Sequence, residues 1–282
     1  MQVVANIYVT TASQAYLRQV VHTVFNSTTN TTKILPTFVD STYNRSSLHY
    51  VSSKPLELAS LISSTVNLIY ESPPPPPASN PSPHPTLGLI DHISLLTIAE
   101  PKLAIQTFEA LALELNPALE FEKYGLACSP PRNLHDVRRE LGYFDEPIQS
   151  SSKPILIGIP TSFVTNYNIR VSFNSSSLFT SEEQEKFCKR LARMIRSRDS
   201  EKTIGVEVLT LPYGENCYEL ATNIHQVEMV TSPAQLMSII EEEISEGDVL
   251  VMGYPIGVTE QILSQLQSQA KNPKEFIFPP LT

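Results

Sequence analysis

The stretch SPHPTLGLIDH, residues 82–92, concentrates side chains that can move protons. It holds His84, Asp91 and His92, two of the six histidines of the chain among them. His84 follows a proline-rich segment and precedes a predicted strand, so its imidazole, with a pKa near neutrality, is a candidate general acid or base. The alternatives are an exposed loop histidine at His84 and a hydrogen-bonded core histidine at His92. The two-residue period of a strand predicts that the side chains of Asp91 and His92 point to opposite faces.

Metal and thiol chemistry find little support in the sequence. His84, Asp91 and His92 lack the spacing of three zinc ligands, so no metal is expected. The three cysteines, Cys128, Cys188 and Cys217, lie far apart without a CxxC spacing and are predicted to be reduced thiols in a reducing compartment. GxSxG, GxxxxGK[ST], GxGxxG and HExxH patterns do not occur, which excludes several common enzyme classes.

The polar stretch VDSTYNRSS, residues 39–47, is a predicted turn between two strands. Asp40, Asn44 and Arg45 are its candidate functional residues. A guanidinium such as that of Arg45 can hold a carboxylate through two parallel hydrogen bonds. The alternative is an ordinary turn, in which Asn, Asp and Ser satisfy their own backbone.

A second polar stretch, VTNYNIRV at residues 164–171, places Asn166 and Asn168 on one side of a predicted strand. Asn223, in ELATNIH, lies on another predicted strand of the same half. Buried amides require hydrogen-bond partners, and a ligand rich in donors and acceptors would supply them. An edge strand with one solvated face is the alternative.

Hydrophobic periodicity predicts the elements that position these residues. The first half reads βαββαβαβα, with strands at about 3–9, 34–40, 46–53, 87–98 and 121–127 and helices at about 12–25, 55–70, 102–115 and 133–144. The second half reads as strands at 154–159, 166–173, 204–211, 217–225 and 248–255, with helices that begin at two capping boxes, Thr180 with Glu183 and Ser232 with Gln235, and a last helix at 259–270.

The serine-rich segment EPIQSSSK, residues 146–153, predicts a boundary between domains 1–146 and 147–282. Adjacent strands joined by short connections in each half argue against a doubly wound sheet. The fold is predicted to be α+β: two ferredoxin-like α/β sandwich subdomains, each with helices on one face of a mixed sheet. The uncovered sheet faces are expected to face each other around a ligand groove.

Composition limits the partners. The chain has 282 residues and a net charge of -9, which disfavours nucleic acid and anionic membrane surfaces. The sequence lacks an apolar stretch of about 20 residues and the basic start of a secretory signal, so a cytoplasmic protein is expected.

Six motifs occur in an order typical of one known family. They are NRSSLHYV (44–51), HPTLGLIDHISL (84–95), YG (Tyr124 and Gly125), VRRELGYF (137–144), VTNYNIRV (164–171) and YELATNI (218–224). Because these motifs occur together in this order, the chain resembles the formiminotransferase domain of formiminotransferase-cyclodeaminase, and more closely the plant formiminotransferase-like proteins. The resemblance covers nearly the whole chain, from about residue 5 to 270.

The resemblance implies a glutamate formimidoyltransferase of histidine degradation and one-carbon metabolism. Such an enzyme moves a formimino group from N-formimino-L-glutamate to tetrahydrofolate, its co-substrate, in a tunnel between two α/β subdomains. His84, in the HPxxG motif, is implied to be the catalytic histidine. From its position and chemistry, Asp40 is the candidate orienting or second acid-base group. The candidate substrate-binding residues are Arg45, Asn44, Tyr124, Asn166, Asn168 and Asn223.

Two departures from the family pattern favour folate binding over transfer. The family often has a basic residue where this chain has Thr86, and a Gly-Ala-Arg sequence where it has IGIPTS. Each lost charge-assisted bond to a dianionic substrate costs roughly 1.5–3 kcal/mol. A non-catalytic folate-binding protein of the same fold is therefore the first alternative. The second is an interaction module in which Pro73–Pro77 is a ligand for SH3 or WW domains, and a homodimer is left open.

Overall fold

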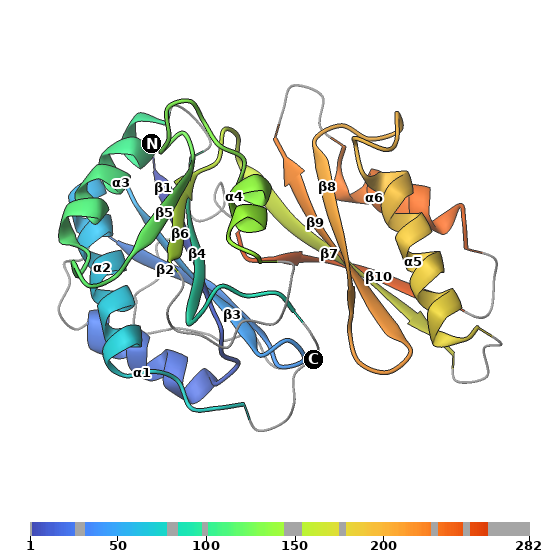
Figure 1. Cartoon of the computed structure of the whole chain (residues 1–282), viewed down its shortest axis with the longest axis horizontal. Helices are drawn as coiled ribbons and strands as arrows, with labels where there is room; N and C mark the ends of the chain where they lie inside the picture. Colours follow the sequence, from blue (N-terminus) through green and yellow to red (C-terminus); the bar gives the residue numbers. More distant parts are fainter. Residues whose placement is uncertain are drawn as a thin grey trace. The chain divides into compact units, whose positions relative to one another are not determined.

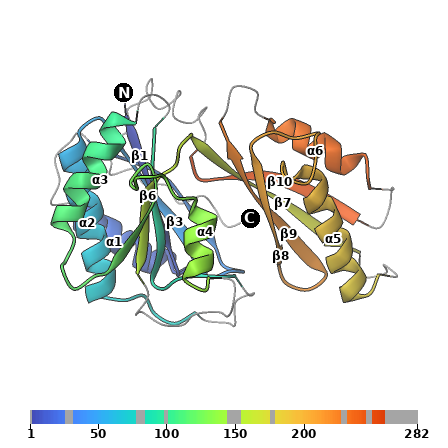
Figure 2. The same ribbon diagram turned by 45° about the horizontal axis from the view of Figure 1, so that its top comes forward.

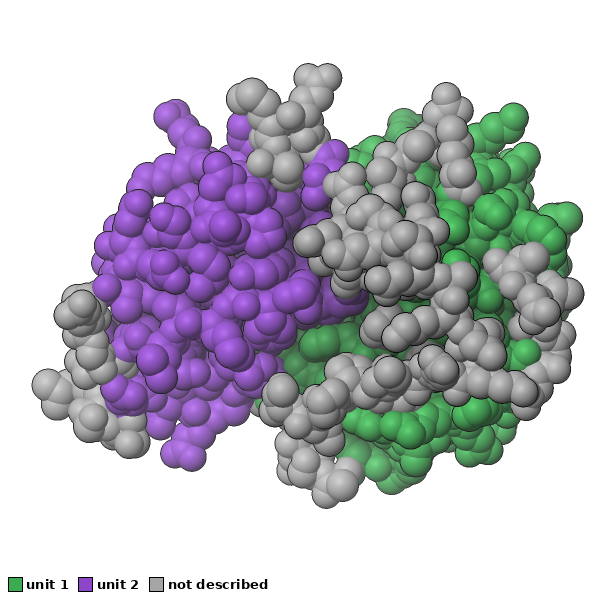
Figure 3. Space-filling view, turned by 180° about the vertical axis from the view of Figure 1, so that it is seen from behind, with its two compact units in different colours: residues 1–163, 264–282 green, residues 164–263 purple. Residues whose placement is uncertain are grey.

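The computed structural model describes residues 2–25, 32–77, 84–97, 101–143, 154–174, 179–226, 231–244 and 249–258. The chain divides into two compact units between Phe163 and Val164, and Figure 3 colours them separately. The first unit is built on a sheet of six strands and the second on a sheet of four. No helix within the described ranges combines the length and apolar character needed to cross a membrane.

The first unit begins with a βαββαβ arrangement (Figure 1). Its elements are β1 (Val3–Val9), α1 (Gln14–Phe25), β2 (Lys33–Asp40), β3 (Arg45–Ser52), α2 (Pro55–Glu71) and β4 (Ile90–Leu96). These four strands pair antiparallel in the order β2-β3-β1-β4, which is the ferredoxin-like arrangement.

Four more elements extend this unit: α3 (Lys102–Glu114), β5 (Phe121–Gly125), α4 (Leu134–Glu140) and β6 (Ile155–Ile159). β6 pairs parallel with both β4 and β5, so the full order is β2-β3-β1-β4-β6-β5 and the sheet is mixed. Helices α1, α2 and α3 cover one face of the sheet, and α4 lies on the other (Figure 2).

Alternation along the strands explains this two-sided arrangement. In β1, Val3, Ala5, Ile7 and Val9 face the helices α1–α3 in the main core, whereas Asn6 and Tyr8 point to the opposite face. On that opposite face Val137 of α4 packs with Tyr124, Tyr143, Leu87 and Leu156 in a smaller cluster. This second face of the first sheet carries the candidate site.

The second unit repeats the βαββαβ arrangement with β7 (Val164–Phe173), α5 (Ser181–Ile195), β8 (Val206–Pro212), β9 (Cys217–His225), α6 (Pro233–Glu241) and β10 (Val249–Ile256). Its sheet has the order β10-β7-β9-β8, again ferredoxin-like. Both predicted capping boxes form, with Thr180 and Glu183 opening α5 and Ser232 and Gln235 opening α6. Ile169, Val171, Leu191, Leu220 and Ile240 are central to its core.

The predicted α+β class is confirmed, with three corrections. The boundary expected between 146 and 147 lies at 163/164, because β6 belongs to the first sheet through its pairing with β4 and β5. The second sheet was expected to be mixed but is antiparallel throughout. Helices were expected on one face of each sheet, but in the first unit α4 lies on the face opposite to α1–α3. The helix predicted at 259–270 lies outside the described residues and stays a prediction. The facing of the two sheets stays a prediction.

Candidate functional site

A β-bulge in β4 determines the geometry of the candidate site. Tyr8 of β1 pairs with His92, but the neighbouring Val9 pairs with Ile90, so Asp91 is an extra residue. A bulge interrupts the two-residue period and re-aims a side chain. The carboxylate of Asp91 therefore lies beside the imidazole of His92, with 3.0 Å between Oδ2 and Nδ1. The predicted opposite orientation of these two side chains is wrong.

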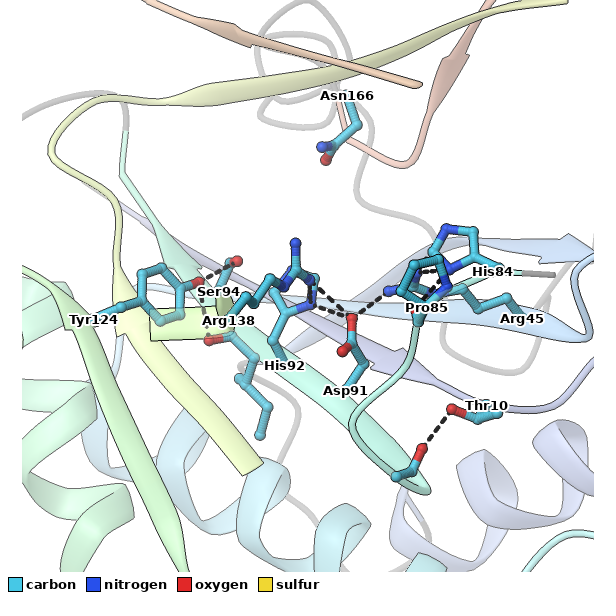
Figure 4. A network of polar contacts seen from close by, with 12 residues as sticks. Thr10, Arg45, His84, Pro85, Asp91, His92, Ser94, Tyr124, Arg138 and Asn166 are labelled. Carbon is cyan, nitrogen blue, oxygen red and sulfur yellow. Dashed lines mark hydrogen bonds and ion pairs between the residues drawn. The ribbon is translucent and has the colours of Figure 1, made fainter. Parts of the chain in front are cut away.

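Asp91 is fully buried and is shared by two arginines (Figure 4). Its Oδ2 accepts hydrogen bonds from Nη2 of Arg45, at the start of β3, and from Nη2 of Arg138, in α4, the latter at 2.9 Å. Burial alone would raise the pKa of Asp91, but the two guanidiniums hold that pKa well below its usual range. Asp91 is therefore a permanent anion at neutral pH.

Arg45 also contacts His84. Its Nη1 lies 2.7 Å from Nδ1 and 2.8 Å from Nε2 of the imidazole. Nδ1 is also 2.7 Å from the carbonyl oxygen of Pro85, which can only accept. The tautomer that satisfies both contacts has Nδ1 donating to Pro85 and Nε2 accepting from Arg45. The rings of Tyr43 and His84 pack edge-to-face, with centroids 4.8 Å apart.

His84 is uncharged in this environment. Burial and the positive charge of Arg45 lower its pKa well below its ordinary value. The expectation that His84 titrates near neutrality is therefore wrong for the protein without ligand. Its imidazole is a neutral, oriented group beside a fixed positive charge.

His92 is a hydrogen-bonded histidine, as one of the two interpretations of the sequence held. Its ring stacks on Tyr8, with centroids 4.1 Å apart, and its Nδ1 lies 2.8 Å from Nη2 of Arg138. Burial and the charge of Arg138 lower the pKa of His92 to about 4, and burial raises the pKa of Tyr8 to about 12. Both groups are neutral at physiological pH.

We call Arg45, His84, Asp91, His92 and Arg138 the His84 cluster. Two guanidiniums and one carboxylate give these five residues one excess positive charge, because both imidazoles are neutral. The side chains of Arg45 and Arg138 are only 12% and 14% exposed, so water screens this charge poorly. A ligand with a carboxylate or another oxyanion would neutralise it.

We expect the free energy of unfolding to fall as the pH is lowered from about 6.5 to about 4. In this interval the unfolded chain binds a proton at His92, with a pKa of about 6.5, while the folded protein resists protonation until about pH 4. The unfolded state then binds more protons, so acid favours it, by up to about 3 kcal/mol for this one group. Urea denaturation at pH 7, 6, 5 and 4.5 measures the loss.

The variant His92→Gln separates this contribution from that of His84, which acts in the same direction. Glutamine cannot titrate, so the stability of the variant should depend less steeply on pH than that of the unmodified protein. Equal slopes for the two proteins would contradict the assignment.

The β2–β3 hairpin holds three of the predicted site residues. Asp40 pairs with Arg45 in the strand register, and its Oδ1 accepts the backbone N–H of Tyr43 at 3.0 Å. Asn44 has a positive φ of 51°, and its Oδ1 accepts the N–H of Ala12 at 2.9 Å. Asn44 thus ties the hairpin to the segment after β1. Arg45 points its guanidinium at Asp91 and His84, which leaves no open two-pronged clamp for a carboxylate.

Tyr124 lies in the interior of the same face. Its hydroxyl is 2.5 Å from Oγ of Ser94 and donates to the carbonyl oxygen of Ile93 at 3.3 Å. The ring crosses over Gly158 of β6, where a Cβ atom would lie 2.5 Å from the ring carbons. Glycine at this position therefore permits the contact between Tyr124 and Ser94.

The predicted asparagines lie in the second unit. Asn166 pairs with Asn223 across β7 and β9, and its Nδ2 donates to Oδ1 of Asn223 at 2.7 Å. The Nδ2 of Asn223 donates in turn to Oε2 of Glu207 at 3.4 Å. Asn166 and Asn168 alternate with Ile169 and Val171 of the core, so they occupy the sheet face away from α5 and α6. A groove shared with the His84 cluster stays a prediction.

Sequence reasoning missed Arg138 as a site residue. Arg138 and Arg139 are adjacent in a short helix, and two such residues are typical of a solvated surface. Arg139 behaves in that way and pairs with Asp136, whereas Arg138 reaches the buried Asp91. The motif VRRELGYF contained Arg138, but nothing in the local pattern distinguishes the two arginines.

Comparisons with known proteins do not assign the chain to a family. No family model matches the chain, and no curated protein matches it. Among solved structures, the periplasmic protease PqqL from Escherichia coli aligns with 95% of this chain and 35% of its own length, at 11% identity and a TM-score of 0.20. The chain thus spans about a third of that protein. Within the described ranges, no group of three or more His, Cys, Asp or Glu residues could hold a metal ion.

Proposed function

We propose that the protein transfers the formimidoyl group of N-formimino-L-glutamate to tetrahydrofolate. The observation that carries this proposal is the His84 cluster, in which a neutral imidazole lies against a buried, excess positive charge. The imidazole of His84 provides a proton acceptor, and the excess positive charge favours an anionic substrate. The ordered family motifs supply the identity of the two substrates.

The reaction requires a proton to change places. As N5 of tetrahydrofolate forms a bond with the formimino carbon, it loses a proton, and the glutamate nitrogen gains one as its bond to that carbon breaks. One imidazole can take the first proton and return it to the leaving nitrogen. His84 is neutral, which is the protonation state required of a base. Its Nε2 becomes available as the proton acceptor when Nη1 of Arg45 turns from it to a substrate carboxylate.

An anionic substrate would also adjust the basicity of His84. The charge of Arg45 lowers the pKa of the imidazole in the protein without ligand. A carboxylate bound near Arg45 and Arg138 offsets that charge and raises the pKa of His84 toward neutrality. His84 would therefore become a stronger base when the substrate is bound. Asp40 is the candidate for a second acid-base group.

The test is an assay of the purified chain with both substrates. Free glutamate should be released from formiminoglutamate in the presence of tetrahydrofolate and not in its absence. Isothermal titration with tetrahydrofolate is measured in parallel. Failure to release glutamate in the presence of tetrahydrofolate would contradict the proposal, whether or not tetrahydrofolate binds.

A non-catalytic folate-binding protein is the second candidate. The contact between Arg45 and His84 favours it, because a guanidinium beside the imidazole weakens the base. Thr86 stands where the family often has a cation. It is buried, and it follows His84 by two residues in the sequence. Binding of tetrahydrofolate without release of glutamate would support this candidate.

The interaction-module hypothesis concerns Pro73–Pro77. These prolines follow α2, lie outside any helix or strand and are mostly exposed. Deleting them and measuring the loss of a bound partner tests this hypothesis.

A further inference from the structure

A strip of buried polar side chains continues from the His84 cluster across the same sheet face. Asn6 of β1 pairs with His49 of β3 on one side and with Ser94 of β4 on the other, and Tyr8 pairs with Ser47 and His92. Residues directly opposite each other in an antiparallel pair share a face. We call Asn6, Ser47, His49 and Ser94 the polar strip. All four are buried, although the face of a sheet is ordinarily apolar where it is buried.

Within the described part of the chain, Oδ1 of Asn6 and Oγ of Ser47, both in the polar strip, have no hydrogen-bond partner. Asn6 is 2% exposed and Ser47 is 0% exposed. The amide of Asn6 bonds the hydroxyl of Tyr8, which leaves its oxygen as the unused acceptor. Buried polar atoms are partnered in the great majority of cases, so an exception calls for a missing ligand or water.

The neighbouring residue on β3 shows that the fold can satisfy a serine here. Ser46 is also buried, and its hydroxyl donates to the carbonyl oxygen of Thr11 at 2.5 Å. Ser46 and Ser47 point to opposite faces by the period of the strand. The unsatisfied hydroxyl therefore lies on the face of the His84 cluster and the satisfied one on the other.

We propose that the polar strip binds neutral N–H groups of the ligand, such as the aminopyrimidinone edge of a reduced pterin. Asn6 Oδ1 can only accept, so the ligand must donate, and a carboxylate has no donor. An ammonium group is disfavoured, because the excess positive charge of the His84 cluster adjoins the strip, with the guanidinium of Arg45 5.6 Å from the ring of Tyr8. An uncharged amino or ring N–H group satisfies both conditions.

This inference rests on the proposed function and assigns the two ends of the ligand to different residues. The charged end is bound by the His84 cluster, and the neutral heterocycle by the polar strip. Tyr8 joins the two, since its hydroxyl bonds Asn6 and its ring stacks on His92.

Isothermal titration of the full chain tests the assignment with two probes: 5-formyltetrahydrofolate, and p-aminobenzoylglutamate, which lacks the pterin. Ser47→Ala should weaken binding of 5-formyltetrahydrofolate at least tenfold and leave the affinity for p-aminobenzoylglutamate unchanged. Its Tm should stay the same or rise by about 2 °C, because an unpartnered buried hydroxyl is removed. Asn6→Leu should lose affinity for 5-formyltetrahydrofolate in the same selective way.

The matched control is Ser46→Ala, one residue away on the opposite face. It removes a hydroxyl that is bonded, so its Tm should fall by about 2 °C and its affinity for 5-formyltetrahydrofolate should not change. Unmodified affinity in both Ser47→Ala and Asn6→Leu would overturn the inference and leave the proposed function standing. An equal loss for both probes would also overturn it. A wild-type chain that binds neither probe would overturn the proposed function and the inference with it.

Discussion

Replacing Asp91 with asparagine is expected to lower the free energy of unfolding by about 3–5 kcal/mol, the usual cost of removing one partner of a buried ion pair. The carboxylate of Asp91 is fully buried and binds both Arg45 and Arg138. Without it, two nearly buried guanidiniums repel each other with no anion between them. Urea denaturation at pH 7, followed by circular dichroism, measures the loss.

Asp136→Asn is the matched control for this substitution. Asp136 also forms an ion pair with an arginine of α4, Arg139, at 2.9 Å, but its side chain is 52% exposed. Exposed pairs contribute about 0–1 kcal/mol because water and salt screen them. Losses of similar size in the two variants would show that Asp91 has no special role in stability.

The elements of both units could be predicted from the sequence because each follows from local periodicity and capping. β9 occupies residues 217–225 as expected, and α5 and α6 begin at the predicted capping boxes. The domain boundary could not be predicted in the same way. The polar, serine-rich segment before β6 resembles a linker. However, β6 belongs to the first unit because it pairs in parallel with β4 and β5, and these long-range contacts cannot be read from the local sequence.

The residue types of the candidate site could be predicted from the sequence, whereas much of its geometry could not. His84 and Arg45 were identified from their chemistry and from the motifs that contain them, and the structure brings them into contact. The relation between Asp91 and His92 was not predictable, because the bulge depends on how β4 pairs with β1. Likewise, the pKa of His84 depends on Arg45, which is 39 residues away in the sequence.

The bulge also explains how the cluster can hold two arginines. By directing Asp91 to the side of His92, it places one carboxylate within reach of β3 and α4 together. A regular strand would turn Asp91 into the apolar layer beneath α1–α3, where a carboxylate has no partner. The positive charge of Arg45, together with burial, keeps His84 neutral in the protein without ligand.

For the proposed transfer, His84→Ala should lower the rate by about 10²-fold or more, which is the usual contribution of a general acid-base group. The imidazole is the group that would take the proton from N5, and alanine cannot replace it. Affinity for tetrahydrofolate should remain largely intact, because the excess charge of Arg45 and Arg138 and the polar strip are retained. Glutamate release and isothermal titration are measured on the same preparation.

His135→Ala is the control, because His135 is a half-exposed histidine of α4 that pairs with Asp136 at the surface. This variant should transfer at the wild-type rate. The loss in His84→Ala should lie in kcat rather than in KM, since the group acts on the reacting atoms and not on the bound charge. Transfer at an undiminished rate in His84→Ala would remove His84 from the mechanism. A rise in KM alone would instead make it a binding residue, because the imidazole would then contribute equally to the bound substrate and the transition state.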